Sequence, residues 1–343
     1  MISLVNPIRP VDAMPDFTMS KNRLGERWAV NLALDLNVIA KMERCFFEGN
    51  TLESEGLVDL VNSLQDGSVV IVPGFALFEV SSKFSARARD GYECFVSKYL
   101  PGYVDTPGTT HSPYRDVTQT RRYDDASQAK RVTFSRTYMA MLLLFIVAKQ
   151  NSLEPEQKFS TFINRMAELT GGIGVLEART AQFVFFDRSR VQVGPWSNFC
   201  RSIRSNFLKS GGTSEKVRLN SFNQAHDLSL IKNATSIHGQ AENGFRTDYW
   251  VAADDEGLIN LCRTFRYNIE SDGFYNGEFI HINNLFPELE LPGFWEETTK
   301  ELQRYHYERE RERNFGFIDD LTFDQLEANV KTLRNEVYSL PYP

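Results

Sequence analysis

Three short apolar runs, separated by segments with helical periodicity, constrain the fold of this chain more than any other feature. Ala29 to Leu34, Val69 to Val72 and Tyr249 to Ala253 each have the length of a buried strand and are too short for a buried helix. Strands that alternate with helices usually form parallel pairs, because the helix returns the chain to the end of the sheet at which it started. The pattern therefore predicts an α/β protein with a central, mainly parallel sheet.

The acidic residues that follow two of these runs are expected to share one edge of that sheet. Asp35 follows the first run, and Asp254 and Asp255 follow the third. The carboxyl ends of parallel strands meet at one edge, where open α/β sheets bind their ligands. Carboxylate oxygens are typical ligands of Mg²⁺ and Mn²⁺, and ions of this kind activate water against phosphodiesters. The sequence therefore predicts a site for divalent cations.

Four segments resemble, in sequence order, the motifs of PIN-like nucleases. Leu34 to Val38 resembles the opening hydrophobic-Asp-x-Asn/Ser-hydrophobic signature, and Val70 to Val80 resembles the strand-Pro-helix-Glu element. His226 to Ala234 resembles the helix that supplies a third acid, and Trp250 to Leu258 resembles the last turn from strand to acid. The resemblance implies a PIN-like three-layer α/β/α fold and metal-dependent cleavage of nucleic acid.

The resemblance also implies which residues form the site. The implied catalytic residues, which would also bind Mg²⁺ or Mn²⁺, are Asp35, Glu79, Asp227 and Asp255, with Asp254 as a further metal ligand and Asn37 in a supporting role. Leu258, three residues after Asp255, favours Asp255 over Asp254. The chain departs from the family at Ala252 and Ala253, because family members often carry Thr or Ser two residues before the last Asp.

Each of these residues also has a purely structural interpretation. Asn37 fits a helix cap, and Asp35 fits a turn residue that hydrogen-bonds nearby backbone N–H groups. Glu79 fits an exposed helix surface, and Asp227 fits a helix that favours negative charge near its N-terminus. Both interpretations stay open at the level of sequence.

The apolar pattern of the sheet is interrupted by a long helical region. Its helical patterns cover 133–150, 155–170, 177–187 and 196–208. The predicted organisation is an N-terminal arm at 1–28, a PIN-like core at 29–90 and 221–285, a mostly helical insertion at 91–220, and a helical, acidic C-terminal extension at 286–343.

Basic residues are enriched near the end of the insertion. In residues 188–218, Glu215 is the one acidic residue. The candidate nucleic-acid contacts there are Arg188, Arg190, Arg201, Arg204 and Lys209. An ordinary solvated helix surface explains the same residues. The net charge of −7 argues against a chain that coats nucleic acid with its whole surface, so any binding falls to local patches.

The remaining composition favours a cytoplasmic protein without a membrane partner. The four cysteines have no C-x-x-C spacing, the N-terminus does not resemble a signal peptide, and the apolar run Tyr138 to Ala148 is too short to cross a bilayer. The acidic C-terminal extension is suited to pairing with a basic protein or to autoinhibition of a basic groove. The protein partner that we consider is an inhibitory protein or a second copy of the chain.

We therefore expect a metal-dependent endoribonuclease, and analogy with the toxin branch of the family suggests a toxin or defence nuclease. RNA is the expected partner and DNA is the alternative, which would make the chain a DNA nuclease of the same class. Two other functions fit the sequence. One is a non-catalytic PIN-like binding or scaffold protein, and the other is a phosphohydrolase that acts on a small nucleotide.

Overall fold

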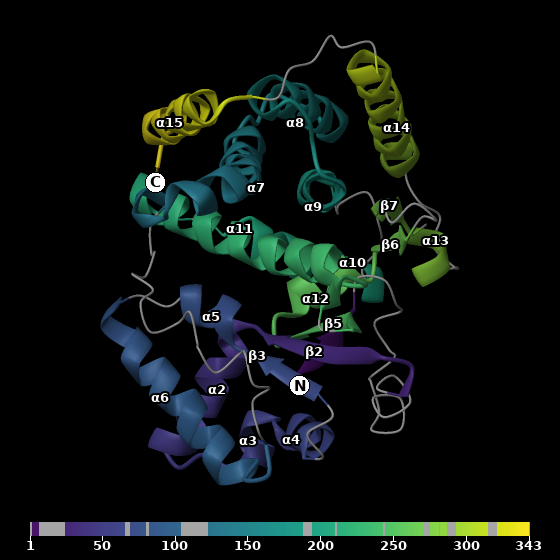
Figure 1. The fold of residues 1–343 in the computed structure, drawn as a ribbon. Helices are drawn as coiled ribbons and strands as arrows, with labels where there is room; N and C mark the ends of the chain where they lie inside the picture. The colour runs from purple at the N-terminus through teal and green to yellow at the C-terminus, as the bar shows by residue number, and fades with distance from the viewer. Residues whose placement is uncertain are drawn as a thin grey trace. The chain divides into compact units, whose positions relative to one another are not determined.

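The chain divides into two compact units, which the computed structural model describes over twelve segments (Figure 1). Unit 1 comprises Met1–Ala126, Leu230–Asp255 and Arg266–Asn276, and unit 2 comprises Ser127–Ser229, Glu256–Phe265 and Gly277–Pro343. The described residues are 2–6, 25–65, 69–79, 82–103, 123–187, 194–209, 211–242, 244–269, 275–280, 282–286, 293–314 and 321–342. The chain is an α/β protein, as predicted, and most of its described residues are helical.

The sheet of unit 1 has the strand order β1-β5-β2-β3, and β4 pairs with β5. Its strands are β1 (Ser3–Val5), β2 (Trp28–Leu34), β3 (Val69–Val72), β4 (Ala241–Glu242) and β5 (Phe245–Ala253). β2 is parallel to β3 and to β5, whereas β1 and β4 are antiparallel to β5. The sheet is therefore mixed rather than mainly parallel. β1 has three residues and β4 has two, which is too little sequence for an apolar pattern to reveal a strand.

The register of β2 and β5 brings the carboxyl ends of these two strands to the same edge of the sheet. Leu34 pairs with Ala252, and the N–H of Asp35 donates to the carbonyl oxygen of Ala252 at 2.9 Å. Helix α2 (Leu36–Phe47) begins directly after Asp35. The segment that follows β2 is thus tied by its backbone to the end of β5.

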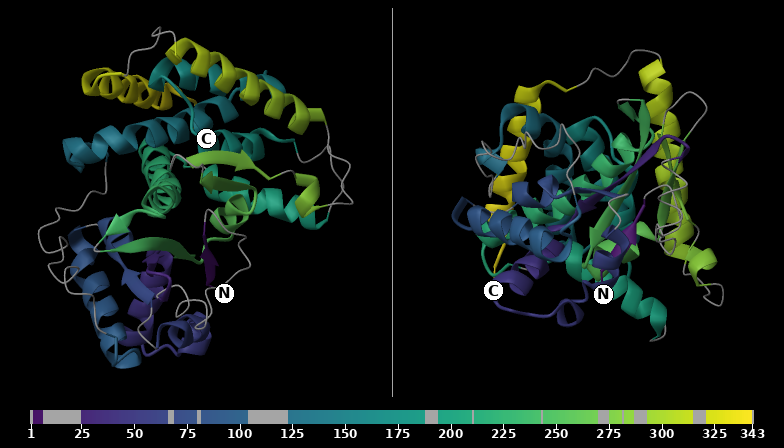
Figure 2. Two further views of the ribbon diagram at one scale, coloured as in Figure 1. Left: turned by 45° about the vertical axis from the view of Figure 1, so that its right-hand side comes forward. Right: turned by 60° about the horizontal axis from the view of Figure 1, so that its bottom comes forward.

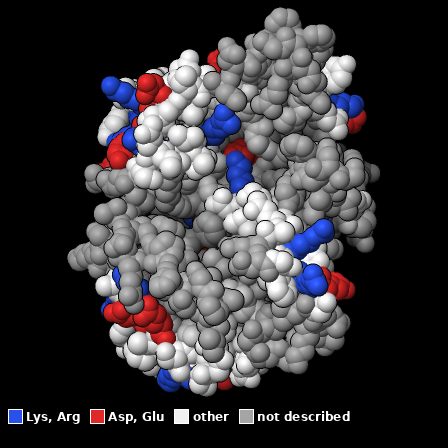
Figure 3. Space-filling view, viewed as in Figure 1, with Lys and Arg blue, Asp and Glu red and all other residues white. Residues whose placement is uncertain are grey.

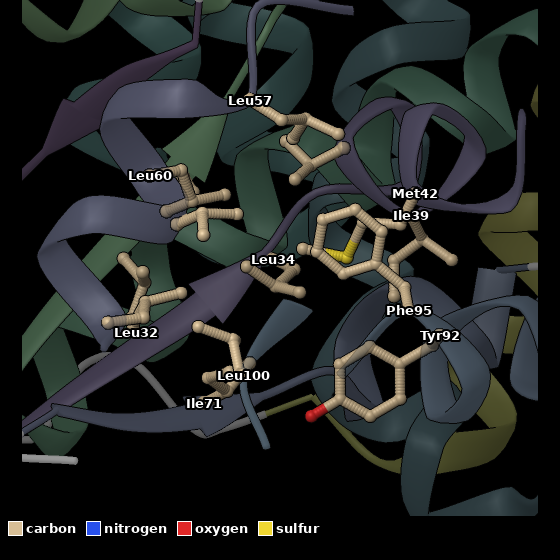
Figure 4. Packing of buried hydrophobic residues seen from close by; sticks show 14 of the residues in the cluster. Leu32, Leu34, Ile39, Met42, Leu57, Leu60, Ile71, Tyr92, Phe95 and Leu100 are labelled. Carbon is tan, nitrogen blue, oxygen red and sulfur yellow. The ribbon is translucent and has the colours of Figure 1, made fainter. Parts of the chain in front are cut away.

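Apolar helix faces cover one side of this sheet and form the core of unit 1 (Figure 4). Leu32, Leu34 and Ile71 come from the strands, and Met42 and Phe95 come from the helices packed on them. The helices that contribute buried residues are α2, α4 (Val58–Leu64), α5 (Gly74–Glu79) and α6 (Ser82–Tyr99). Burial of such side chains stabilises a fold by about 1.5–3 kcal/mol each, so this cluster is the main source of stability in unit 1.

Two segments whose sequences each predict a single helix, 53–64 and Phe75 to about Arg89, are divided in the structure. The pattern over 53–64 forms α3 (Leu52–Glu55) and α4, separated at Gly56, whose φ of 66° is readily adopted by glycine. The predicted helix that begins at Phe75 forms α5 (Gly74–Glu79) and α6, and residues 80–81 lie outside the described residues.

β3 is the last strand in the order of the sheet, and one of its backbone N–H groups is hydrogen-bonded to a side chain. The N–H of Ile71 donates to the phenol oxygen of Tyr103 at 2.5 Å. Tyr103 follows α6 in sequence and packs against the core of unit 1. A backbone donor of β3 is therefore satisfied by a side chain from outside the sheet.

Buried polar contacts connect β1 to β5. The side-chain amide of Asn6 donates to Asp248 Oδ1 and to the carbonyl oxygen of Tyr249, both at 3.2 Å. His238 Nδ1 lies 3.5 Å from the same Asp248 oxygen and accepts the N–H of Tyr249 at 3.3 Å. Asp248 is completely buried. A strand from the predicted N-terminal arm is thus part of the sheet, while residues 7–24 of that arm lie outside the described residues.

Unit 2 is built around long helices (Figure 1 and Figure 2). α7 packs against α8, α9 and α15, and α10 packs against α9 and α12. The main helices of unit 2 are α7 (Gln128–Ala148), α8 (Pro155–Thr170), α9 (Val175–Phe185), α10 (Pro195–Phe207), α12 (Glu256–Cys262), α14 (Gly293–Asn314) and α15 (Phe323–Ser339). Helix α11 (Ser214–Ile237) is divided: residues 214–229 belong to unit 2 and residues 230–237 to unit 1. The four helices predicted between residues 133 and 208 are confirmed as α7 to α10.

One described helix segment, Arg131–Ala148 in α7, is long and apolar enough to cross a membrane, and most of it is buried inside the structure. The apolar run at 138–148 is thus part of a longer apolar helix than its length in the sequence indicates, and the burial of this helix is typical of a core helix. α9 is also buried along almost its entire length. These two helices therefore supply much of the core of unit 2.

The segment after α12 contains a two-stranded sheet of β6 (Phe265–Ile269) and β7 (Tyr275–Phe279), followed by α13 (Ile282–Leu285). The 3-10 turn η2 (Tyr123–Asp125) precedes α7. The sequence of residues 278–282 also predicts a strand, and this prediction lies about three residues later than β7. Residues from Ile282 instead belong to a short helix, and apolar runs of this length do not distinguish the two structures.

Gly257→Ala should destabilise unit 2, because α12 approaches α10 too closely for a side chain at this position. A Cβ atom there would lie 2.5 Å from the carbonyl oxygen of Ser202 and 2.6 Å from Asn206 Cβ. Overpacking of this kind costs about 1–3 kcal/mol. Urea denaturation of the full chain measures the change. Gly293→Ala, at the start of α14, is the matched control, because its nearest contact is a flexible Glu297 oxygen at 3.6 Å. Equal stability of the two variants would contradict this expectation.

Candidate functional site

Asp35 lies in the connection between β2 and α2, with its side chain almost completely buried. It precedes the first residue of α2 in extended conformation, and its side chain is 4% exposed. The side-chain amide of Asn37 donates to Asp35 Oδ2 at 3.1 Å. The alternative role of Asn37 as the helix cap is therefore wrong, because α2 begins at Leu36 and Asn37 lies inside its first turn. Asn37 instead fixes the orientation of the Asp35 carboxylate.

The surroundings of Asp35 disfavour its charged form. Burial raises the pKa of this carboxyl from 3.8 to about 6, and repulsion from Asp255 acts in the same direction. The neighbouring N–H of Leu36 and the amide of Asn37 oppose the rise in pKa, but they do not offset it. Asp35 and Asp255, which are far apart in sequence, are thus close enough for their charges to interact.

Asp254 has a different environment from Asp255. Lys41 Nζ lies 2.8 Å from Asp254 Oδ2, and the same ammonium donates to the carbonyl oxygen of Glu55 at 3.0 Å. The side chains of Lys41 and Asp254 are 14% and 22% exposed. The two consecutive acids at the end of β5 therefore interact with different groups: Asp254 with the Lys41 ammonium and Asp255 with the Asp35 charge.

A second ion pair fixes the backbone that Lys41 contacts. Arg44 donates to both carboxylate oxygens of Glu55, at 3.0 and 2.7 Å, and Asn50 donates to one of them at 2.6 Å. These hydrogen bonds, that of Arg44 above all, hold the pKa of Glu55 below its ordinary value. Paired contacts of this kind are the stronger ones among charged hydrogen bonds. The end of α3 is therefore attached firmly to α2.

Two of the predicted acids are not placed with Asp35 by the described structure. Glu79 is the last residue of α5, which packs against α2 and β2, but its side chain lies outside the described residues. Asp227 lies on α11, half-buried, among residues of unit 2, whereas Asp35, Asp254 and Asp255 belong to unit 1. The roles of Glu79 and Asp227 stay predictions.

The candidate nucleic-acid contacts divide into three groups. Arg188 and Arg190 lie outside the described residues. Arg204 donates to the carbonyl oxygen of Val184 at 2.5 Å, which attaches α10 to the end of α9. Arg201 and Lys209 are exposed. On the face shown in Figure 3, described Lys and Arg side chains are interspersed with Asp and Glu. A nucleic-acid surface at these positions stays a prediction.

Lys41 is a residue of this site that the sequence analysis did not identify. It follows Asn37 by one helical turn and so lies on the same face of α2, which is the available signal in the sequence. A lysine on an amphipathic helix is usually solvated, however, so the spacing alone does not indicate a buried partner. The ion pair with Asp254 depends on the close approach of α2 to the end of β5.

Among the described residues, no group of three or more His, Cys, Asp or Glu side chains is arranged to bind a metal ion. The described part of the candidate site therefore offers two neighbouring carboxylates, those of Asp35 and Asp255, and the amide of Asn37. A buried carboxylate that is repelled by a half-buried neighbouring carboxylate is chemically suited to a divalent cation, which commonly binds through one or two carboxylates and water.

No protein family, curated protein or solved structure matches the chain. The PIN-like resemblance therefore rests on the sequence motifs.

Asp35→Asn should stabilise the metal-free protein at neutral pH. Because the folded pKa of about 6 lies above the ordinary value of 3.8, protonation of Asp35 favours the folded state. That stability is complete below about pH 4 and is lost as the pH rises through about 6. At about pH 7 the charged Asp35 then destabilises the fold by up to about 3 kcal/mol, at about 1.4 kcal/mol per pKa unit.

Urea denaturation with chelator present, at about pH 5 and about pH 7, measures this effect. The stability gain in Asp35→Asn should be larger at the higher pH. Asp59→Asn, on the exposed side of α4, is the control and should show no such difference. The same pH dependence in Asp35→Asn and wild type would contradict the assignment of a raised pKa to Asp35.

Proposed function

We propose that this chain is a metal-dependent endoribonuclease with a PIN-like core, in which Asp35 and Asp255 bind Mg²⁺ or Mn²⁺. Glu79 is proposed as a further acid of the site by resemblance to the family motifs, and the role that the resemblance implies for Asp227, a residue of unit 2, stays a prediction from sequence. The observation that carries the proposal is the parallel register of β2 and β5, which brings two acids from distant parts of the sequence to one edge of the sheet. Ligands of open α/β sheets bind at such edges.

The energetics of Asp35 support a cationic ligand. A carboxylate that is 4% exposed and repelled by Asp255 is unfavourable at neutral pH without a compensating charge. Residues with strongly perturbed pKa values concentrate at functional sites, where the perturbation serves binding or catalysis. A divalent cation between Asp35 and Asp255 would relieve this repulsion. If Asp35 served only as a turn residue, its carboxylate would not need to lie beside a second acid.

The chain's own residues have distinct roles in the proposed reaction. Asn37 orients the Asp35 carboxylate through its amide, and the backbone bond from Asp35 to Ala252 holds that carboxylate at the end of β5. When bound, a divalent cation supplies a lowered water pKa and stabilises charge on the leaving oxygen. Asp35 and Asp255 would bind the cation through carboxylate oxygens, and their fixed positions would orient the phosphodiester for attack.

RNA is the proposed substrate, and a cytoplasmic location is proposed with it. The family resemblance implies phosphodiester cleavage, and the exposed Arg201 and Lys209 are proposed to contact phosphate groups. With a net charge of −7, binding of RNA by such local residues should weaken strongly as salt increases.

Cleavage of labelled RNA and DNA by the purified full chain tests the proposal. Wild type should cleave RNA with Mn²⁺ or Mg²⁺ and should be inactive with chelator. Loss of a residue that hydrogen-bonds a metal ligand typically lowers metal affinity or activity by about 10–100-fold. Loss of a ligand itself should have a larger effect, so Asp35→Asn and Asp255→Asn should each lower the cleavage rate by at least about 100-fold. Asp59→Asn, which changes an exposed acid of the same unit, should retain activity.

The other outcomes identify the alternatives. Metal-dependent cleavage of DNA but not of RNA would make the chain a DNA nuclease of the same class. Metal-dependent binding of RNA without cleavage would favour a scaffold protein. Cleavage that both Asp35→Asn and Asp255→Asn retain would remove these two residues from the mechanism.

A further inference from the structure

Lys41 forms a bridge between the end of α3 and the candidate site. Its ammonium contacts Asp254 Oδ2 at 2.8 Å on one side and the carbonyl oxygen of Glu55 at 3.0 Å on the other. The side chain of Glu55 is itself bound by Arg44 and Asn50. The ammonium is therefore fixed by a rigid acceptor and does not depend on Asp254 for its position.

This arrangement gives different surroundings to the two acids that follow β5. Asp254 is paired with the Lys41 ammonium and its side chain is 22% exposed, so breaking the pair would remove an attraction between two partly desolvated charges. Asp255 interacts electrostatically with Asp35. Of the two acids, Asp255 shares its surroundings with the buried carboxylate, and Asp254 is directed to α2 and α3.

We propose that Lys41 is a positioning residue that withdraws Asp254 from metal binding and leaves Asp255 as the ligand beside Asp35. This inference rests on the proposed function. Lys41 has two effects in this role: it determines which carboxylate faces Asp35, and it limits the negative charge at the end of β5. The second effect can be measured as the affinity for a divalent cation.

The proposal predicts the direction in which each substitution changes the Mn²⁺ affinity. A lysine that served only to stabilise the fold would not change the Mn²⁺ affinity in these directions. Lys41→Met removes one positive charge and releases Asp254, so Mn²⁺ should bind more tightly. Asp254→Asn leaves the Lys41 charge uncompensated, so Mn²⁺ should bind more weakly. Coulomb's law, even at the dielectric constant of water, gives on the order of tenfold for a unit charge acting on a divalent ion a few ångströms away. The double variant restores the charge balance and should bind Mn²⁺ like wild type.

The affinities can be measured from the unfolding temperature of the full chain at increasing Mn²⁺ concentrations, because an ion that binds the folded state raises this temperature. The measurement does not require enzymatic activity. Lys98→Met is the matched control, because Lys98 is an exposed lysine of unit 1 and contacts Tyr99. Its Mn²⁺ affinity should equal that of wild type. Cleavage of RNA at saturating Mn²⁺ gives a second measurement, in which Asp254→Asn should retain the wild-type rate and Asp255→Asn should lose it.

The outcomes separate this inference from the proposed function. If wild type shows no stabilisation by Mn²⁺, the metal site itself is rejected. If wild type binds Mn²⁺ but Lys41→Met binds it equally or less tightly, the role of Lys41 is rejected and the metal site remains. If Lys41→Met does not fold, the Mn²⁺ affinities of Asp254→Asn and of the double variant are compared instead, and the inference requires tighter binding in the double variant. Weak binding in both would show that Asp254 is itself a ligand and would overturn the inference.

Discussion

The candidate site depends on the parallel pairing of β2 with β5. Leu34 is opposite Ala252, and the backbone bond from Asp35 to Ala252 continues the connection beyond the last paired residues. A shift of one residue in this register would turn the side chains of either strand to the opposite face. The buried apolar residues of β2, among them Leu32 and Leu34, pack against α2 and α4 and prevent such a shift. Packing of the core therefore determines the geometry of acids that lie outside it.

The acids near this edge of the sheet differ in whether a positive charge lies beside them. Glu55 and Asp254 have cationic partners in Arg44 and Lys41, whereas Asp35 is buried next to another acid and has the amide of Asn37. The ion pairs attach α3 to α2 and stabilise the surroundings of the site. Asp35 itself lowers the stability of the metal-free fold at neutral pH. A stable frame around an unfavourable carboxylate is the arrangement expected where binding, and not folding, has determined the residue.

The sequence predicted the parts of the structure that depend on local pattern. β2, β3 and β5 were identifiable because each contains a short, mostly apolar run, and α7 to α10 because their periodic patterns are long. β1 was not identifiable, because three residues carry no pattern and the partners of the adjacent Asn6, Asp248 and Tyr249, are more than two hundred residues away. The proximity of Asp35 to Asp255 follows from parallel strands, but the partner of Asp254 does not. Lys41 and Asp254 meet through tertiary packing, which a single sequence does not encode locally.

The bond from Ile71 to the phenol of Tyr103 has a consequence for how copies of this protein behave at high concentration. β3 ends the strand order of the described sheet, and an unpaired strand border can recruit a strand from another molecule. The Tyr103 hydroxyl accepts one donor on that border, the N–H of Ile71, and the Tyr103 side chain packs against the core of unit 1. β-strand addition at this position would first have to displace Tyr103 from the core of unit 1, so the tyrosine protects the protein against edge-to-edge aggregation.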